Sequence, residues 1–252
     1  MLMTDLEIRH HAYSHLDFNS PLSDFRADSL LDSLRPLAGA RVVDLGCGWA
    51  ELLLRLLAAE PTASGVGVDR DARVLDRARV NAEARGLSDR LRLERAEAAT
   101  WTGGPADVVI VIGASHAFGG TRQALRAVSP LLAEGGRVLL GEGFWQHPPT
   151  PEALAALEAG PDDFGSLSEL VGLAAESGYR PLEFSVASEE EWDTFESRWC
   201  GGLERWAREH PEDPGAGPAR ELADEHRTQY LAGYRGVFGL AYLTLVAEPS
   251  GR

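Results

Sequence analysis

The segment Val43-Asp-Leu-Gly-Cys-Gly-Trp-Ala50 sets the architecture of the whole chain. It follows a short apolar run and opens an amphipathic one, which indicates a turn from a strand into a helix. Gly46 and Gly48 permit a tight turn and a close approach of a ligand to the backbone. A dinucleotide-binding turn would have a third glycine at position 51, where Glu51 stands instead. Its carboxylate would face the pyrophosphate, so the segment argues against NAD and FAD.

On both sides of this turn the sequence alternates short apolar segments with amphipathic ones. Such alternation is typical of a parallel sheet with helices on both of its faces. Residues 107–112 are apolar at nearly every position, as expected of a central strand that is covered on both sides. The predicted strands are residues 41–45, 65–69, 91–95, 107–112 and 137–141, and the predicted helices are residues 51–59, 72–85 and 121–133.

Beyond Phe144 the pattern changes. Prolines and glycines interrupt residues 148–161 before a helical segment at residues 168–177. Residues 181–187 and 236–246 then predict a sixth and a seventh strand. A long segment therefore separates the last two strands of the predicted sheet.

This segment, residues 189–233, is rich in polar and aromatic residues. Within it Trp192, Trp199 and Trp206 recur every seven residues, which favours a buried helical seam over a ligand cage. Residues 211–218 are rich in proline, glycine and acidic side chains and predict an exposed loop.

The charge of the chain excludes several classes of protein. All 24 basic residues are arginines, and the chain contains no lysine. A Schiff-base enzyme, a P-loop NTPase and a protein kinase each need a lysine ammonium group, so these mechanisms are excluded. The 39 acidic residues give a formal net charge of -15, and no arginine cluster forms a basic face. Nucleic acid is therefore not an expected partner.

Two further features concern metals and the cellular compartment. Cys47 and Cys200 are too few for a disulfide framework and lack metal-ligand spacing, so we expect reduced thiols. The histidines near the N-terminus have no carboxylate or cysteine partner at a recognised spacing, and no metal site is predicted. Residues 1–16 lack an apolar signal core, and no apolar run reaches the length of a membrane span. A cytoplasmic protein with no membrane partner is expected.

The glycine turn resembles the first motif of class I S-adenosylmethionine-dependent methyltransferases, Asp/Glu-x-Gly-x-Gly-x-Gly. Asp44, Gly46 and Gly48 are in register with this motif, and Ala50 replaces its last glycine. The cofactor of that family is a cationic sulfonium without a phosphate. An acidic residue at position 51 is therefore compatible with it.

Further matches occur at the intervals of the same family. Asp69 ends the second predicted strand, where a carboxylate accepts hydrogen bonds from ribose hydroxyls, and Asp71 is the alternative. Ala96-Glu-Ala98 resembles the adenine-contacting position, and Ile112-Gly-Ala-Ser115 ends the fourth strand where the transferable methyl group would lie. The resemblance implies S-adenosyl-L-methionine as cofactor and S-adenosyl-L-homocysteine as product, held by Asp44, Gly46, Cys47, Gly48, Asp69, Arg70, Ala96, Glu97, Ala98, Gly113 and Ser115.

The likeness extends over nearly the whole chain, to a branch of bacterial small-molecule methyltransferases. It rests on Gly141-Glu-Gly-Phe-Trp145, on Glu191-Trp192, on Tyr230 with Tyr234, and on residues 15–29. It implies an α/β fold with a Rossmann-like seven-stranded sheet, a helical N-terminal lid and a helical insertion between strands six and seven. The implied segments are the lid at residues 1–40, the cofactor-binding core at residues 41–188, the helical cap at residues 189–233 and the last strand at residues 234–252.

Methyl transfer needs a nucleophile about 3 Å from the methyl carbon, with water excluded. A hydroxyl acceptor also needs a general base, and His116, three residues past Gly113, is the best-placed candidate. Its alternatives are to line the acceptor pocket or to cap the next helix. Glu142 is the second catalytic candidate. The candidate acceptor-binding residues are Tyr13, His15, His116, Trp145, Trp199, Arg227, Tyr230 and Tyr234.

Two alternatives limit this assignment of the acceptor side. The aromatic residues after position 189 could form a helical cap packed by its own side chains. The Asn/Asp-Pro-Pro-Tyr/Phe motif of amine and amide methyltransferases is absent after the fourth strand, and the missing lysines exclude the Lys-Asp-Lys-Glu ribose methyltransferases. A small-molecule methyltransferase is therefore predicted. A Rossmann-fold oxidoreductase and a non-catalytic S-adenosylmethionine-binding domain remain as alternatives, and the sequence indicates neither the methylated element nor the oligomeric state.

Overall fold

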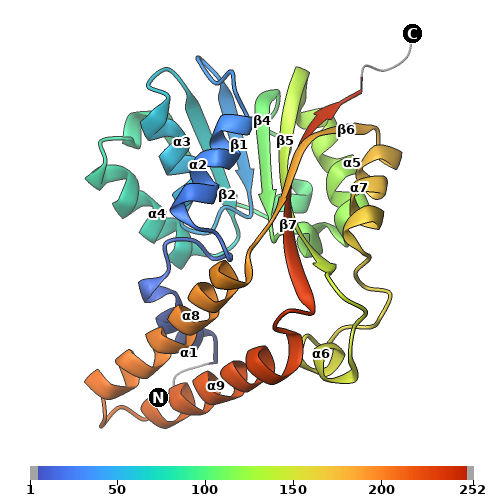
Figure 1. The fold of residues 1–252 in the computed structure, drawn as a ribbon. Helices are drawn as coiled ribbons and strands as arrows, with labels where there is room; N and C mark the ends of the chain where they lie inside the picture. Colours follow the sequence, from blue (N-terminus) through green and yellow to red (C-terminus); the bar gives the residue numbers. More distant parts are fainter. Residues whose placement is uncertain (1–4, 249–252) are drawn as a thin grey trace. The chain divides into compact units, whose positions relative to one another are not determined.

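The computed structural model describes residues 5–248, which form two compact units (Figure 1). The sheet unit consists of residues 24–143, 167–186 and 240–248, and the helical unit of residues 5–23, 144–166 and 187–239.

The units divide the chain differently from the predicted segments. Residues 24–40, predicted as part of the lid, group with the sheet, and residues 144–166, predicted as part of the core, group with the helices. The ends of the predicted lid and last strand, residues 1–4 and 249–252, lie outside the described residues.

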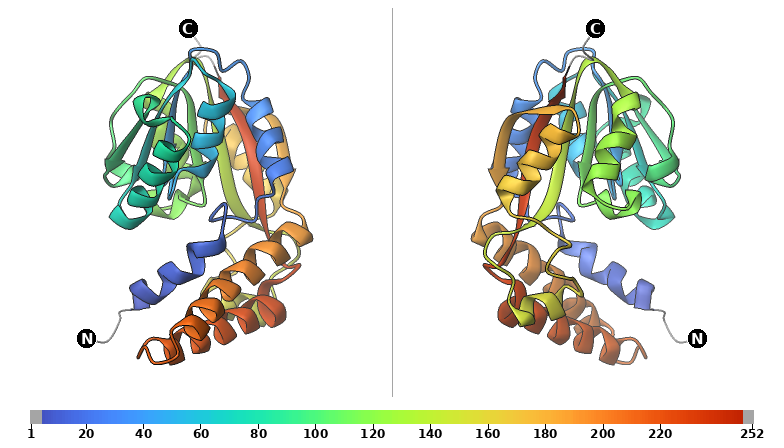
Figure 2. Two further views of the ribbon diagram at one scale, coloured as in Figure 1. Left: turned by 90° about the vertical axis from the view of Figure 1, so that its left-hand side faces the viewer. Right: turned by 90° about the vertical axis from the view of Figure 1, so that its right-hand side faces the viewer.

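The sheet contains seven strands in the order β3-β2-β1-β4-β5-β7-β6. Strands β1 to β5 pair in parallel, and β6 pairs antiparallel with β7. Helices cover both faces of the sheet (Figure 2), which confirms the predicted α/β class. The strands are β1 (Arg41–Leu45), β2 (Ser64–Asp69), β3 (Leu91–Arg95), β4 (Ala106–Ile112), β5 (Leu132–Trp145), β6 (Tyr179–Val186) and β7 (Phe238–Ala247).

The core of the sheet unit lies between the central strands and their helices. Leu53, Leu54 and Leu57 of α3 are fully buried, as is the middle of β4, so the prediction of a central strand there is confirmed. The helices of this unit are α2 (Asp24–Ser33), α3 (Glu51–Ala59), α4 (Ala72–Ala84), α5 (Thr121–Val128) and α7 (Leu167–Glu176).

Proline explains two differences from the predicted elements. The helix predicted at residues 121–133 ends at Val128, because Pro130 cannot continue it and the chain passes through a 3-10 turn into β5. Conversely, the proline-rich segment after Phe144 contains the short helix α6 (Pro151–Ala156). Pro151 occupies its first turn and the Thr150 hydroxyl accepts a hydrogen bond from the Ala153 N–H, as is favourable at a helix start.

The helical unit is built around two long helices, α8 (Glu189–Glu209) and α9 (Ala216–Thr228). A π-helix (Gln229–Tyr234) continues α9, and α1 (Asp5–Ala12) packs against α8. Because α9 begins at Ala216, the loop predicted at residues 211–218 is shorter than expected. No helix among residues 5–248 is long and apolar enough to cross a membrane.

The tryptophans of α8 pack within the helical unit. Trp199 is buried and stacks on His226 at 3.9 Å between ring centroids, and Trp206 stacks on His11 of α1 at 4.1 Å. Trp192 meets the edge of the Tyr234 ring. Trp199 is therefore buried, as the seam interpretation predicts, whereas Trp192 and Trp206 are partly buried.

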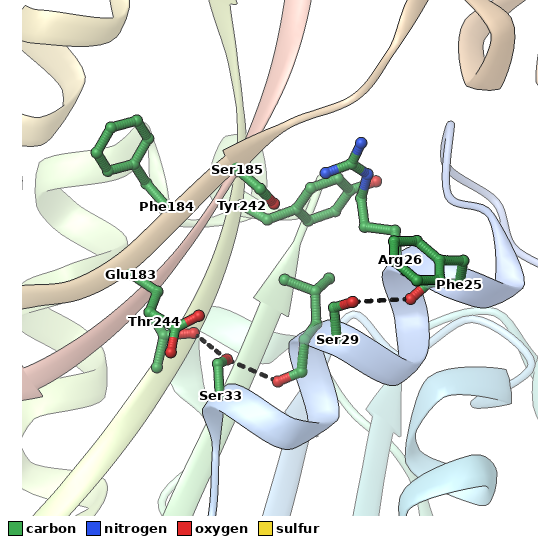
Figure 3. A pocket seen from close by; sticks show the side chains of 10 residues that line it. Phe25, Arg26, Ser29, Ser33, Glu183, Phe184, Ser185, Tyr242 and Thr244 are labelled. Atoms are coloured by element: carbon green, nitrogen blue, oxygen red, sulfur yellow. Dashed lines mark hydrogen bonds between the residues drawn. The ribbon is translucent and has the colours of Figure 1, made fainter.

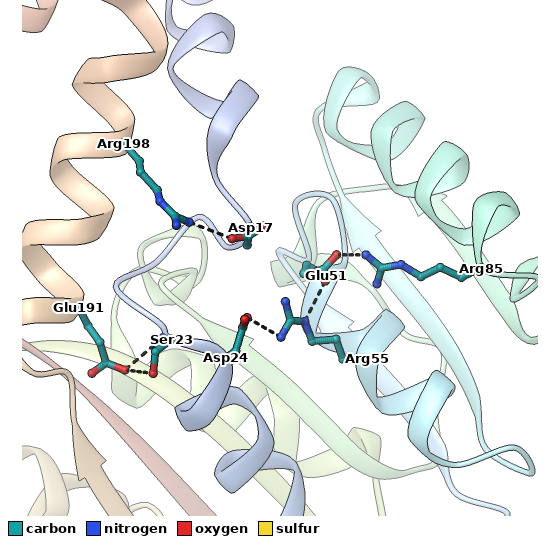
Figure 4. Close-up of polar contacts among 8 residues, drawn as sticks. All are labelled: Asp17, Ser23, Asp24, Glu51, Arg55, Arg85, Glu191 and Arg198. Carbon is teal, nitrogen blue, oxygen red and sulfur yellow. Dashed lines mark hydrogen bonds and ion pairs between the residues drawn. The ribbon is translucent and has the colours of Figure 1, made fainter.

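One face of α8 also holds the N-terminal segment. The Ser23 hydroxyl and N–H both donate to Glu191 Oε1, at 2.6 and 3.1 Å, and Arg198 pairs with Asp17 at 2.9 Å (Figure 4). One turn further on, Gly202 leaves room for the end of α1, because a Cβ there would lie 2.6 Å from the carbonyl oxygen of His11.

This close approach makes Gly202→Ala destabilising although alanine is the better helix former. We expect a loss of about 1–2 kcal/mol in the free energy of unfolding, because the clash with backbone atoms outweighs the gain in helix propensity. The matched control is Gly201→Ala, where a Cβ meets only the flexible end of Arg205. That variant should gain about 0.5–1 kcal/mol. Urea unfolding measures both, and equal stability of the two variants would contradict the packing described.

Candidate functional site

The turn between β1 and α3 is held in a conformation that needs glycine. Gly46 has φ +77°, and a Cβ there would lie 2.5 Å from the Cβ of Ala114, in the loop after β4. The N–H groups of Gly46 and Cys47 both donate to the carbonyl oxygen of Val68, at 2.8 and 3.0 Å. The turn is therefore pressed between the ends of β2 and β4, at the carboxyl edge of the parallel strands where open α/β sheets bind ligands.

Asp69, the last residue of β2, fixes this turn through both of its carboxylate oxygens. Oδ2 accepts a hydrogen bond from the Gly48 N–H and Oδ1 one from the Asp71 N–H, each at 2.9 Å. Asp71, the predicted alternative to Asp69, instead caps α4 by accepting a hydrogen bond from the Arg73 N–H at 2.8 Å. Of the two acids, Asp69 is the one joined to the glycine turn.

Asp44 lies under the same turn and is only 6% exposed. Burial, and then the negative charge of Asp69, raise the pKa of Asp44 to about 7. The same causes, with the charge of Asp44 added, raise the pKa of the Cys47 thiol well above its usual value, so Cys47 is not a reactive thiolate. Two neighbouring carboxylates thus make this corner of the sheet favourable for a positive charge.

The residues on either side of the glycines are engaged within the protein. Glu51, at the start of α3, accepts hydrogen bonds from Arg55 Nε at 2.9 Å and Arg85 Nη2 at 2.7 Å, and Arg55 also pairs with Asp24 (Figure 4). Trp49 is buried, with the guanidinium carbon of Arg77 4.1 Å from its ring centroid. Glu51 is therefore part of an ion-pair network and does not face a ligand alone.

The third and fourth strands bring further candidates to the same edge. The Ala96 N–H donates to the carbonyl oxygen of Asp69 at 3.1 Å, which joins the end of β3 to that of β2. Gly113 has φ +63° with open space where a Cβ would point, and Gly48 has the same property at φ +55°. Ala98 and Ser115 are buried, whereas Glu97 and Arg70 are exposed.

The two catalytic candidates differ in their surroundings. His116 is exposed on a short 3-10 helix (Ser115–Phe118). Glu142 is buried, and it accepts hydrogen bonds from the Thr121 hydroxyl at 2.9 Å and the Gly143 N–H at 3.1 Å. Since both of its oxygens are bonded, Glu142 ties the start of α5 to β5, and His116 is the more accessible of the two candidates.

Three acceptor-binding candidates, Trp145, Arg227 and Tyr230, take part in packing and polar contacts within the helical unit. The Tyr230 hydroxyl donates to Asp193 at 2.7 Å. Hydrogen bonds from Tyr230 and Arg235 lower the pKa of Asp193 to about 2, with the contribution of Arg235 the larger. Trp145 is buried, and its Nε1–H donates to the carbonyl oxygen of Pro161 at 3.1 Å. Arg227 pairs with Asp224 and Glu204.

The other candidates of this unit differ in exposure. Tyr13 is partly buried and His15 is exposed, and both belong to the short 3-10 helix (Tyr13–His15) that follows α1.

Sequence reasoning missed the buried polar cluster of the helical unit. Glu196 is 3% exposed and accepts hydrogen bonds from His226 Nε2 at 2.6 Å and from the Tyr234 hydroxyl at 2.7 Å. A helical spacing was available as a signal, because His226, Tyr230 and Tyr234 recur every four residues. Only the packing of α8 against this face shows that Glu196 is the partner of His226 and Tyr234, and Asp193 that of Tyr230.

The chain is similar to known methyltransferases and to a protein of Escherichia coli. Residues 43–138 match the family described as Methyltransferase domain. Over 233 residues the chain is 29% identical to the YjhP protein of Escherichia coli, a match that covers 91% of this chain and 94% of that protein.

Two solved structures of S-adenosylmethionine-dependent methyltransferases in complex with S-adenosyl-L-homocysteine are also similar. The one from Geobacter sulfurreducens is 26% identical with a TM-score of 0.90, and covers 98% of this chain and 100% of its own. The one from Thiobacillus denitrificans is 29% identical with a TM-score of 0.88 and the same coverage. The protein is a class I S-adenosylmethionine-dependent methyltransferase, as its glycine turn predicts. The oxidoreductase alternative receives no support from these likenesses.

The two glycines of the turn make different demands on the protein. Gly46→Ala combines a left-handed φ with a clash against Ala114, so we expect it to cost about 2–4 kcal/mol of stability. Gly48→Ala meets open space and should cost only about 1–2 kcal/mol. Urea unfolding of both variants measures the difference. Equal losses would show that Ala114 does not restrict the turn.

Proposed function

We propose that this methyltransferase transfers a methyl group from S-adenosylmethionine to a small-molecule acceptor. The observation that carries the proposal is the pair of neighbouring carboxylates, Asp44 and Asp69, at the glycine turn. A carboxylate whose pKa is raised by burial and by a like charge costs stability, and such a cost is typical of functional sites. A cationic ligand bound there would offset it.

The residues of the turn fit S-adenosylmethionine. When bound, this cofactor supplies a methyl group attached to a sulfonium. Asp69 holds the Gly48 N–H in place and presents a carboxylate at the end of β2, suited to hydroxyl groups. Gly48 and Gly113 leave open space above the backbone. The S-adenosyl-L-homocysteine of the two solved relatives supports the same assignment.

A small molecule is the acceptor that the composition favours. A net charge of -15 without a basic cluster disfavours nucleic acid. We further propose that His116 accepts the proton of a hydroxyl or other weakly acidic acceptor, with Glu142 holding the neighbouring loop through Thr121. The remaining candidate acceptor-binding residues belong to the helical unit.

Asp44→Asn tests the proposal because it should raise the stability of the protein and weaken its binding of S-adenosylmethionine. The folded-state pKa of about 7 lies above the unfolded value of 3.8, so this carboxyl lowers stability as the pH rises from about 4 to 7. The asparagine variant should therefore be more stable than the wild type at pH 8, by roughly 2–4 kcal/mol, and no more stable at pH 4. Urea unfolding at both pH values measures this.

The same variant should bind S-adenosylmethionine at least about tenfold more weakly at pH 8, because the negative charge is lost. Isothermal titration with S-adenosylmethionine and S-adenosyl-L-homocysteine measures the affinity. In the wild type, affinity should also fall about tenfold between pH 8 and pH 6, as Asp44 takes up a proton. A wild-type protein that binds neither compound would refute the proposal.

The acceptor can be sought by mass spectrometry of small molecules released from the purified protein. With that acceptor in hand, His116→Ala should reduce turnover by about a hundredfold or more, because general-base catalysis contributes at least that much. Cofactor affinity should stay unchanged and serves as the control. A loss below about threefold would assign His116 to the wall of the acceptor site.

A further inference from the structure

Strand β6 forms one edge of the sheet. In the part of the chain that the structure describes, β7 is the strand that pairs with it, and its other side is left open. Edge strands of monomeric proteins are usually protected by prolines, charges or bulges. Here Pro181 and a bulge between Pro181 and Glu183 protect the first half of β6, while Phe184–Ser185–Val186 has no such device.

Large apolar side chains are exposed on β6 and on the helix beside it. Phe184 is 60% exposed, and Leu182 at the bulge is 54% exposed. Phe25 of α2, which lines the groove beside the strand, is 82% exposed. Exposed apolar groups on both sides of an open strand edge favour association with another protein chain.

The two faces of β6 differ in chemistry. Glu183 and Ser185 pair with Thr244 and Tyr242 of β7, and their side chains lie in a groove of about 200 Å³ beside α2, whereas Phe184 points the other way (Figure 3). Arg26 of α2 lines the same groove. A cation and a carboxylate therefore share one side of the strand, and an aromatic ring occupies the other.

The edge of β6 is complementary to the same edge of a second copy of the chain. When β6 is placed antiparallel to a second β6, with Phe184 opposite Phe184, Glu183 falls opposite Ser185 and not opposite another carboxylate. The two phenyl rings meet on one face. On the other face the Glu183 carboxylate of each copy enters the groove that contains the other copy's Arg26. Apolar contact and charge thus agree on a single register.

The overall charge makes this surface stand out. Two chains of net charge -15 repel each other, so a contact between copies needs a surface of low net charge. Within the groove the charges of Arg26 and Glu183 cancel, and at the start of β6 Arg180 pairs with Glu248. We propose that the protein forms a twofold dimer in which β6 pairs antiparallel with β6 of a second copy, with Phe184 opposite Phe184.

Sedimentation velocity and light scattering of the full chain test the dimer. The wild type should have about twice the 27.2 kDa mass of one chain at micromolar concentration, and the dimer should strengthen with added salt as repulsion is screened. Phe184→Glu should give a monomer, because two carboxylates would then face each other. The control is Val80→Glu on α4, a similarly exposed side chain at 65%, which should remain dimeric.

The register is tested by a mixed experiment. Phe184→Glu and Phe184→Lys should each be monomeric alone, but an equimolar mixture should restore a dimer because the opposite charges meet at the axis. A wild type that is monomeric at 100 times the concentration of the first measurement would overturn the proposal. So would a dimer that survives Phe184→Glu, or a mixture that stays monomeric. Circular dichroism of each variant verifies folding.

Discussion

The site depends on one carboxylate, Asp69, at the end of a buried parallel strand. Its two oxygens accept backbone N–H groups from the glycine turn and from the start of α4, so the ends of three elements are fixed by a single side chain. The close approach of Gly46 to Ala114, in the loop after β4, connects the fourth strand to this arrangement. Without the hydrogen bonds to Asp69, the left-handed turn would keep its conformational cost and lose what offsets it.

The charge at this corner explains why the protein keeps a destabilising residue. Asp44 is buried beside a like charge, which an enzyme without a cationic ligand would have no reason to retain. Glu51, by contrast, is balanced by Arg55 and Arg85 and belongs to the structure of the fold.

The helical unit shows the same division between packing and chemistry. Its aromatic residues first suggest an acceptor pocket, but Trp199 and Tyr234 are buried against His226 and Glu196. A π-helix brings Tyr230 and Tyr234 to the same face, which places both hydroxyls on carboxylates of α8. Buried polar networks of this kind fix the pairing of helices.

The sequence by itself determined the order of strands and helices around the glycine turn. Apolar residues that face the core recur every two residues in a strand and about every 3.6 residues in a helix, and this period is visible in the sequence. It also identified the turn and Asp69, because these residues match the glycine motif and the strand-ending acid of class I methyltransferases. It did not reveal the partners of Glu51 and Glu196, and it placed the end of the helix that begins at Thr121 five residues too late. Those choices depend on which side chains meet across the fold, and only the tertiary structure brings such distant positions together.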